Sequence, residues 1–496
     1  MAINLIKEPR LEAKLQAFCY QTDAVEAIRD LPYGAIFHEQ GLGKSKIAVD
    51  IILYWLERKL VDTVLLVAKK GLVENWKREL STHSYLKPRI LTGNRSVNFH
   101  VLNSPARIIL THYEAVKAES KRLALFQKTR SVAVILDEAT KIKNPDSSIT
   151  QVFFELAPGF VRRIILTGTP VANRPFDIWA QIYFLDQGAS LGTDFNEFKR
   201  SLDLTNELGG NEVERSKFEK ALVDIQNRIS SFCVRENKNS EFIHLPDKVI
   251  KPIWTDWEPT QYDLYCQYRD DLRAIVVRSG IPSEDKADDI IKRLLRLVQI
   301  ASNPRLVDES YQVDPGKWEY LIQLLEQIRS KGEKAIVWTV FTDNADWLAN
   351  RLRSFGTSKI HGKLSMEERN RAVKKFLDDP GCKVLVATPG AAKEGLTLTV
   401  ANHVIFYDRG FGLDDYLQAQ DRIHRVSQVK TCYVYNLLMR DSIDGWVDVL
   451  LQAKRLAAQL AQGDISLEFY QSQMTYSFGD ALREILNINE KVGERE

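Results

Sequence analysis

Residues 33–60 read YGAIFHEQGLGKSKIAVDIILYWLERKL and combine three patterns in one run. The first five residues are almost all apolar, which is typical of a strand buried on both faces. Residues 46–60 space their apolar side chains as a helix does. Between these two segments lies HEQGLGKS (38–45), with two glycines and a Lys-Ser pair. A strand, a glycine-rich turn and a helix in this order predict an α/β unit with a ligand site where the strand ends.

The same rhythm recurs in both halves of the 496-residue chain. Short apolar runs alternate with stretches of helical spacing, and this alternation predicts parallel sheets covered by helices. We therefore expect an α/β fold with two parallel-sheet lobes and with helical insertions between and on them. The apolar runs lie at 33–37, 63–68, 106–111, 132–137 and 162–169 in the first half, and at 334–339, 382–388, 403–408 and 432–437 in the second.

Two charged stretches interrupt this rhythm, at about 185–235 and 258–305. Both have helical spacing and few apolar runs, so we expect a helical protrusion on the first lobe and a helical insertion in the second. The predicted division of the chain is a first lobe over 1–238, a second lobe over 239–465 and a C-terminal helical tail over 466–496.

The overall composition excludes several classes of protein. The chain has 68 basic and 66 acidic residues, so its net charge of +2 does not by itself indicate a nucleic-acid partner. The five cysteines are scattered without a C-x-x-C pair, which argues against a zinc site and a disulfide framework. No apolar run is long enough for a membrane span, and we find neither a signal peptide nor a nuclear signal. We expect a cytoplasmic protein without membrane partners, in a prokaryotic or virus-infected cell rather than in a nucleus.

The loop HEQGLGKS has the residue types that phosphate binding requires. Gly41 and Gly43 let the backbone approach a ligand, and backbone N–H groups at a helix N-terminus bind anions. Lys44 can reach the phosphates of ATP, and Ser45 can ligate Mg²⁺. The loop consensus has glycine where His38 stands, so a chance loop is the alternative for this segment alone. The predicted nucleotide-binding residues here are Gly41, Leu42, Gly43, Lys44 and Ser45.

A second segment carries two adjacent carboxylates. In VAVILDEATKIKN (132–144), Asp137 and Glu138 stand where a buried strand ends. One carboxylate can hold Mg²⁺ through its water shell, and its neighbour can deprotonate the attacking water. Burial and mutual repulsion disfavour such a pair without a nearby cation, and a solvated surface pair is the alternative. Together with the loop, the pair predicts a site for ATP hydrolysis in which Ser45 and one of the two acids, Asp137 or Glu138, hold the metal.

A third segment, YLQAQDRIHRVSQ (416–428), lies in the second half of the chain. It places Arg422 and Arg425 three residues apart, which puts them on one face if the segment is helical. Arginines from a second lobe can neutralise the charge on a phosphoryl group in transfer. Taken alone, the two arginines could equally form an ordinary solvated face.

These motifs, in this order, resemble those of the superfamily-two helicase-like ATPases, specifically the Swi/Snf-type DNA translocases. The resemblance runs over nearly the whole chain and includes YQ (20–21), GLVENWKRE (71–79), LTGTPVAN (166–173) and ATPGAAKEGLTL (387–398). It implies two RecA-like lobes, hydrolysis of ATP with Mg²⁺, and double-stranded DNA as a partner.

The resemblance also implies roles for single residues. In the first lobe Gln21 would read the adenine, and in the second lobe Gln418 would act as a nucleotide sensor. The implied catalytic residues are Lys44, Asp137, Glu138, Arg422 and Arg425. The residues implied to couple the ATP site to the nucleic-acid groove are Thr167, Gly168 and Thr169. The residues that correspond to the family's DNA-facing loops are Lys69, Lys70, Asn75, Trp76, Thr111, Gly362, Thr388 and Gly395.

Several positions depart from the family's pattern. His38 stands where Asp is usual, Thr140 replaces a His, and Thr397 replaces an Asn, while Ala392 and Lys393 replace two glycines. None of these changes removes a group that acts in phosphoryl transfer. Three functions stay open at this point: a translocase on double-stranded DNA that remodels protein–DNA complexes or branched DNA, a strand-separating DNA or RNA helicase, and a motor subunit that works with a partner such as a nuclease or methyltransferase.

Overall fold

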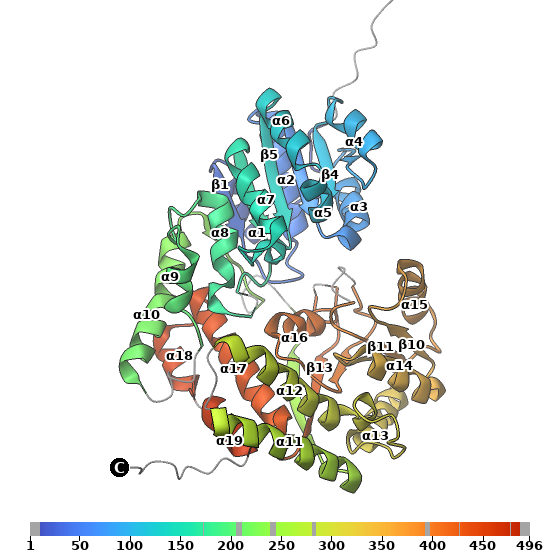
Figure 1. Cartoon of the computed structure of the whole chain (residues 1–496). Helices are drawn as coiled ribbons and strands as arrows, with labels where there is room; N and C mark the ends of the chain where they lie inside the picture. The colour runs from blue at the N-terminus through green and yellow to red at the C-terminus, as the bar shows by residue number, and fades with distance from the viewer. Residues whose placement is uncertain are drawn as a thin grey trace, which may run out of the picture. The chain divides into compact units, whose positions relative to one another are not determined.

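The computed structural model describes residues 10–171, 173–204, 211–238, 245–279, 284–391, 397–425, 427–476 and 478–486, and Figure 1 labels their helices and strands. The chain folds into two compact units. The first comprises Met1–Leu204, Ser216–His244 and Ala457–Phe469, and the second comprises Thr205–Arg215, Leu245–Leu456 and Tyr470–Glu496. The predicted lobe boundaries at 238 and 465 stay a prediction, and residues 457–465 are grouped with the first unit because of tertiary contacts that hydrophobic spacing does not reveal.

The first unit is built on a parallel sheet with the strand order β3-β4-β2-β5-β6-β1-β7. All five apolar runs of the first half form strands in it, which confirms that prediction. The additional strands β3 and β7 lie at the two edges and are two residues long, too short for an apolar run to predict them. The strands are β1 (Tyr33–Ile36), β2 (Thr63–Ala68), β3 (Arg89–Ile90), β4 (Ile108–His112), β5 (Val132–Asp137), β6 (Arg162–Leu166) and β7 (Cys233–Val234).

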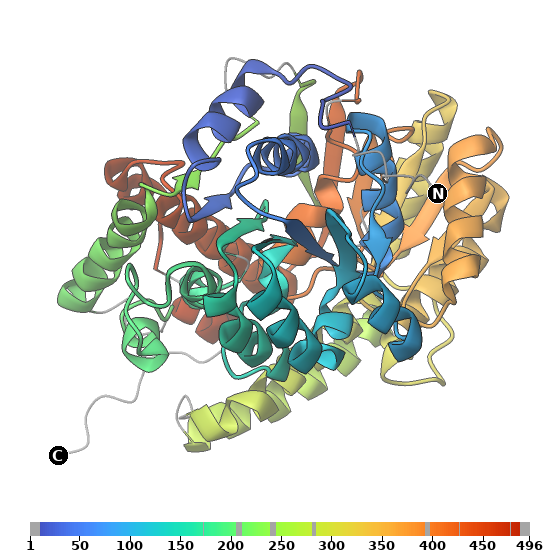
Figure 2. The same cartoon turned by 90° about the horizontal axis from the view of Figure 1, so that it is seen from above.

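Helices cover both faces of this sheet (Figure 2). One face packs against α1 (Cys19–Ile28), α2 (Lys44–Glu57) and α3 (Val73–His83), whose apolar side chains share one buried cluster with β2, β4, β5 and β6. On the other face a chain of ring contacts links Tyr113, Phe153 and Phe184. These rings come from α5 (Tyr113–Ala118), α7 (Ser148–Leu156) and α8 (Trp179–Asp186). The remaining helices of this part are α4 (Arg95–Leu102), α6 (Ser120–Thr129), α9 (Phe195–Arg200) and α10 (Glu212–Ile229).

The second unit has its own parallel sheet, with the order β10-β11-β9-β12-β13-β8. The four apolar runs of the second half form the inner strands, as predicted. The sequence did not predict the edge strands β8 and β10. Strand β8 is largely exposed and contains Pro252, which lacks a backbone N–H and therefore suits an edge. The strands are β8 (Lys248–Thr255), β9 (Ala335–Trp338), β10 (Thr357–Ile360), β11 (Val384–Ala387), β12 (His403–Phe406) and β13 (Cys432–Met439).

Two buried apolar clusters, one on each face, hold helices against this second sheet. Two parallel sheets, each covered by helices, confirm the predicted α/β fold class. In the described part of the chain, no helix has the length and apolarity that crossing a membrane requires. The helices are α11 (Pro259–Ser279), α12 (Glu284–Ser302), α13 (Lys317–Ser330), α14 (Thr342–Arg351), α15 (Met366–Asp378), α16 (Leu413–Gln420), α17 (Ile443–Ala461), α18 (Leu467–Gln473) and α19 (Phe478–Ile485).

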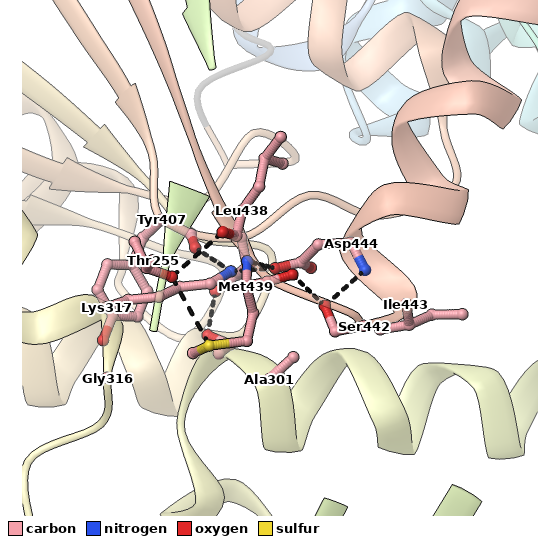
Figure 3. Close-up of polar contacts among 12 residues, drawn as sticks. Thr255, Ala301, Gly316, Lys317, Tyr407, Leu438, Met439, Ser442, Ile443 and Asp444 are labelled. Carbon is pink, nitrogen blue, oxygen red and sulfur yellow. Dashed lines mark hydrogen bonds and ion pairs between the residues drawn. The ribbon is translucent and has the colours of Figure 1, made fainter. Parts of the chain in front are cut away.

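A buried ion pair joins elements of the second unit that are far apart in the sequence (Figure 3). The ammonium of Lys317, at the start of α13, lies 2.5 Å from a carboxylate oxygen of Asp444 in α17. It also donates a hydrogen bond of 3.0 Å to the carbonyl of Tyr407, just after β12. Next to this pair, the backbone N–H of Ile443 donates to the hydroxyl of Tyr265 in α11 at 2.9 Å. The helical insertion is therefore attached to the start of α17 through a directed polar contact.

Candidate nucleotide and nucleic-acid site

The predicted phosphate loop lies between β1 and α2, where the parallel strand ends and the helix begins. Gly41 and Gly43 have φ angles of 89° and 72°, in the region that favours glycine over residues with a side chain. Gly43 is also the N-cap of α2, a helix of 14 residues. The loop therefore presents its backbone N–H groups together with a helix N-terminus, which is a favourable arrangement for a phosphate anion.

Lys44 folds back over its own loop. Its ammonium donates hydrogen bonds to the carbonyl oxygens of His38 at 2.7 Å and Glu39 at 3.1 Å. Burial lowers the pKa of Lys44 to about 8, although the carboxylates of Glu138 and Asp137 act in the opposite direction. The lysine is thus held at the loop by neutral carbonyls, which a phosphate can replace as stronger, charged acceptors.

Gln21, the predicted adenine reader, contacts the loop directly. Its side-chain amide donates to the carbonyl of Leu42 at 3.3 Å, and its amide oxygen accepts from the backbone N–H of Phe18 at 3.1 Å. A Cβ atom at Gly43 would lie 2.3 Å from the Gln21 amide nitrogen, so only glycine fits there. The structure therefore brings together residues from two separate sequence motifs, on α1 and on the phosphate loop.

The two predicted acids lie at the end of β5. The side chain of Asp137 accepts a hydrogen bond of 2.8 Å from the indole N–H of Trp76, and another of 3.0 Å from the backbone N–H of Glu138. Burial, with the neighbouring Glu138 carboxylate, raises the pKa of Asp137 to about 6. Two converging donors fix the direction of the Asp137 carboxylate, which is how a metal ligand is usually oriented.

Glu138 has an unusual backbone for a residue with a side chain. Its φ angle of 54° lies in the left-handed region, and such outliers cluster at functional sites. One carboxylate oxygen of Glu138 is buried without a hydrogen-bond partner, and the nearest cation is the ammonium of Lys69 at 3.7 Å. A buried acceptor of this kind is available to a water molecule or a substrate group.

Trp76 contributes to the site in a way that the sequence did not predict. The resemblance placed it among the DNA-facing residues, but its side chain is 1% exposed and packs in the apolar cluster on the α1–α3 face. Its indole instead orients Asp137, and the hydroxyl of Tyr113 donates to the Asp137 carbonyl at 2.8 Å from the other side. Trp76 and Asp137 are separated by 61 residues, so no local pattern reveals the contact.

The predicted coupling tripeptide follows β6 and packs against the phosphate loop. The backbone N–H of Thr169 donates to the Thr167 hydroxyl at 3.2 Å, which closes a tight turn. A Cβ atom at Gly168 would lie 2.8 Å from the side chain of Gln40 and 3.3 Å from the Lys44 ammonium. The lack of a side chain at Gly168 therefore allows Gln40 and Lys44 to lie close to this turn.

His38, at the first position of the loop, is a buried imidazole. It is 2% exposed, and neither ring nitrogen has a hydrogen-bond partner of suitable geometry. Burial lowers its pKa to about 4, and the nearby cations Lys44 and Arg235 act in the same direction. His38 is therefore neutral at pH 7.

We expect His38 to make the protein less stable in acid. The unfolded chain binds a proton at this residue below about pH 6.5, while the folded chain resists protonation down to about pH 4. Protonation of His38 therefore does not change the free energy of unfolding above about pH 6.5. As the pH falls towards 4, it lowers the free energy of unfolding by up to about 3 kcal/mol. Urea unfolding at pH 7, 6 and 5 should show a smaller loss of stability in His38→Gln than in the native protein. Equal losses in the two proteins would exclude His38 as a source.

The second unit carries the other predicted catalytic residues. Gln418 is buried on α16 and donates to the side chain of Asp414. The helix ends at Gln420, so Arg422 and Arg425 lie in turns, and the condition under which they would share one helical face is not met. Arg422 is buried, whereas Arg425 is half-buried and donates to the hydroxyl of Thr397 at 2.9 Å.

The predicted DNA-facing residues differ in accessibility. Lys70 and Gly362 are exposed, and Lys69 and Asn75 are half-buried. The side chains of Thr111 and Thr388 are buried, so, as with Trp76, we do not include them among the proposed contacts to DNA. Gly395, Ala392 and Lys393 lie outside the described residues.

The residues of the first unit fit ATP with Mg²⁺. The loop offers backbone donors, Lys44 is displaceable, Asp137 is oriented by two donors, and Glu138 has a free acceptor. Within the described ranges, no group of three or more His, Cys, Asp or Glu side chains could hold a metal ion by itself. Proteins usually bind Mg²⁺ through one or two side chains, waters and the phosphates of a substrate.

Comparison with known proteins defines first a class and then a family. Residues 20–306 match the SNF2-related domain, and residues 316–427 match the helicase conserved C-terminal domain. Together with the phosphate loop and the paired acids, these two domains indicate a nucleic-acid-dependent ATPase. Because the first match covers more than half of the chain, the protein belongs to the SNF2-related family. This confirms the resemblance that the motifs suggested.

Individual relatives are similar over most of this chain. It is 28% identical to the putative ATP-dependent helicase/translocase YwqA of Bacillus subtilis, over 88% of this chain and 47% of YwqA. It is 27% identical to an uncharacterized ATP-dependent helicase of Mycoplasma pneumoniae, over 91% of this chain and 43% of that protein. The chain thus spans about half the length of these relatives. The Sulfolobus solfataricus SWI2/SNF2 ATPase core in complex with dsDNA aligns at 25% identity with a TM-score of 0.43, covering 98% of this chain and 100% of that chain.

Proposed function

We propose that this protein hydrolyses ATP to move along double-stranded DNA, and that it thereby remodels protein–DNA complexes or branched DNA. The observation that carries the proposal is the packing of Gly168 on Gln40 and Lys44. The turn implied to couple ATP to nucleic acid lies close to Lys44, the lysine that we propose binds the phosphates. Membership of the SNF2-related family and the naming of YwqA as a helicase/translocase support the same function.

In the proposed reaction, Lys44 leaves the two loop carbonyls and binds the phosphates, which compensate its charge better than neutral oxygens do. Glu138 accepts a proton from the attacking water through its free carboxylate oxygen. Trp76 keeps the Asp137 carboxylate in one orientation. Ser45 and Asp137 would hold Mg²⁺, which when bound neutralises the negative charge of the phosphates.

The second unit supplies residues whose proposed roles come from the family motif. Arg422 and Arg425 would stabilise the negative charge on the transferring phosphoryl group, and Gln418 would sense the nucleotide. Arg425 contacts Thr397, one of the residues that departs from the family's pattern. Arg425 has to leave Thr397 before it can bind a phosphate. The strength of its hydrogen bond to Thr397 therefore affects how readily the arginine becomes available.

For the nucleic acid, we propose contacts to the phosphate backbone through Lys69, Lys70, Asn75 and the exposed backbone at Gly362. Such contacts tolerate any base sequence and weaken with salt. We also propose that a protein partner supplies biological specificity, and the two relatives named above are bacterial. Their bacterial origin supports our proposal of a cytoplasmic location.

Steady-state ATP hydrolysis measured with four additions tests the proposed function: no nucleic acid, single-stranded DNA, duplex DNA and duplex RNA. We expect duplex DNA to stimulate the rate most, and we expect the stimulation to fall between 50 and 200 mM salt. Stimulation chiefly by single strands or by RNA would contradict the translocase and support a strand-separating helicase. A rate that no nucleic acid changes would contradict direct coupling and support a motor that depends on a partner protein.

A further inference from the structure

Residues 233–238 run alongside the entry to the phosphate loop. Strand β7 pairs in parallel with β1, and the backbone N–H groups of Phe37 and Glu39 continue the pairing by donating to Val234 at 2.8 Å and Glu236 at 2.9 Å. The pairing therefore extends two residues into the loop, as far as Glu39. A side chain on this segment is close enough to act on the loop without touching the nucleotide.

Arg235, in the middle of this segment, makes three hydrogen bonds. One guanidinium nitrogen donates to the carbonyl of Phe37, the residue just before the loop, at 2.5 Å. The other two donors both bind the carboxylate of Asp464 at 2.6 Å. The two side chains are only 15% and 11% exposed, so the pair is largely shielded from water. A two-point arginine–carboxylate pair of this kind fixes the guanidinium in one orientation.

Asp464 comes from a distant part of the chain, 229 residues after Arg235. It follows α17, and the turn that presents it depends on Gly463, whose φ angle is 75°. A Cβ atom at Gly463 would lie 2.4 Å from the side chain of Gln226 in α10. The backbone N–H of Asp464 also donates to the carbonyl of Gln459 at 2.8 Å. The position of the carboxylate is therefore set by a glycine turn that packs closely against α10.

The charge of Arg235 acts on the phosphate loop. It is among the causes that lower the pKa of Lys44 and of His38, after burial as the largest cause in both. Asp464 compensates this charge where the chain leaves α17. The pair thus has two effects on the loop: it anchors the carbonyl of Phe37, and Asp464 partly compensates the positive charge of Arg235 beside the loop.

We propose that Arg235 and Asp464 are positioning residues for ATP binding, through which the segment that follows α17 holds the phosphate loop in its binding conformation. This inference rests on the proposed function, because it assumes that residues 38–45 bind ATP. Arg235 lies within the first matched domain, whereas Asp464 lies outside both, so the inference adds a contribution to the ATP site from a part of the chain that neither match covers.

The test is the dissociation constant for ATP in the presence of Mg²⁺, measured on the full chain. Arg235→Gln removes the anchor on Phe37 and leaves the Asp464 carboxylate uncompensated beside an anion site. Both effects weaken ATP binding, and we expect at least about a tenfold loss of affinity. Arg10→Gln is the matched control, because Arg10 forms a similar pair with Glu12 in the first unit but is exposed, and it should leave the affinity within about twofold.

The double variant Arg235→Gln, Asp464→Asn separates positioning from stability. It removes the buried charge, so its melting temperature should recover towards the native value, while its ATP affinity should stay severalfold below native because the anchor is still missing. If Arg235→Gln does not fold, the ATP affinity of the double variant tests the inference on its own. An affinity equal to native in either folded variant would overturn the inference. Failure of the native protein itself to bind ATP would instead overturn the proposed function.

Discussion

Glu138→Gln is expected to lower ATP turnover by about 10²–10⁴-fold while ATP affinity stays within about threefold of native. Glutamine keeps the size and the hydrogen-bonding oxygen of the side chain, but it cannot take a proton from water. The carboxylate oxygen that lacks a hydrogen-bond partner in the structure is the atom that this change inactivates. Single-turnover hydrolysis and equilibrium ATP binding, measured on the same preparation, give the two quantities.

Glu74→Gln provides the control for this substitution. Glu74 lies on α3 in the same unit and forms an exposed ion pair with Lys77, so the same chemical change there should alter neither quantity. If Glu138→Gln hydrolyses ATP at the native rate, Glu138 is not the base. If it loses ATP affinity and turnover to the same extent, its role is in binding.

Lys317→Met is expected to lower the free energy of unfolding by about 3–5 kcal/mol. The variant leaves the Asp444 carboxylate, 5% exposed, without its cation and removes a donor from the carbonyl of Tyr407. Methionine fills most of the space of the lysine stem. The loss of stability therefore measures the effect of the missing charge and not that of a cavity. Urea unfolding followed by tryptophan fluorescence and by circular dichroism measures it.

The double variant Lys317→Met, Asp444→Asn tests this explanation. Asparagine keeps the oxygen that accepts from the backbone N–H of Met439 at 2.9 Å, but it carries no charge. We expect most of the lost stability to return. A double variant as unstable as Lys317→Met would show that the loss does not come from the uncompensated carboxylate.

The sequence predicted the inner strands of both sheets, because strands buried on both faces must be apolar throughout. It did not predict the edge strands β3, β7, β8 and β10, which are short or partly exposed and therefore lack a distinctive pattern. Its spacing would put Arg422 and Arg425 on one face only if that segment were helical, and α16 ends before them. Local spacing shows which residues can share a helix face, and it does not show where tertiary contacts end the helix.

The sequence also predicted part of the candidate site, namely the residues that lie in short local motifs. The loop and the acids lie in short local motifs, and the structure places Gln21, Gly43, Lys44 and Gly168 close together. The contact of Trp76 with Asp137 spans 61 residues and that of Arg235 with Asp464 spans 229. Contacts over such separations depend on how the strands are ordered in the sheet, which one sequence read locally does not determine.

Displacement of a triplex-forming strand from duplex DNA tests the central proposal most directly, because only movement along the duplex removes that strand. We expect the native protein to displace the strand when ATP and Mg²⁺ are present, and we expect the Glu138→Gln variant to leave the triplex intact. If the native protein hydrolyses ATP in the same reaction and leaves the triplex intact, it does not translocate on double-stranded DNA, and the proposed function is contradicted.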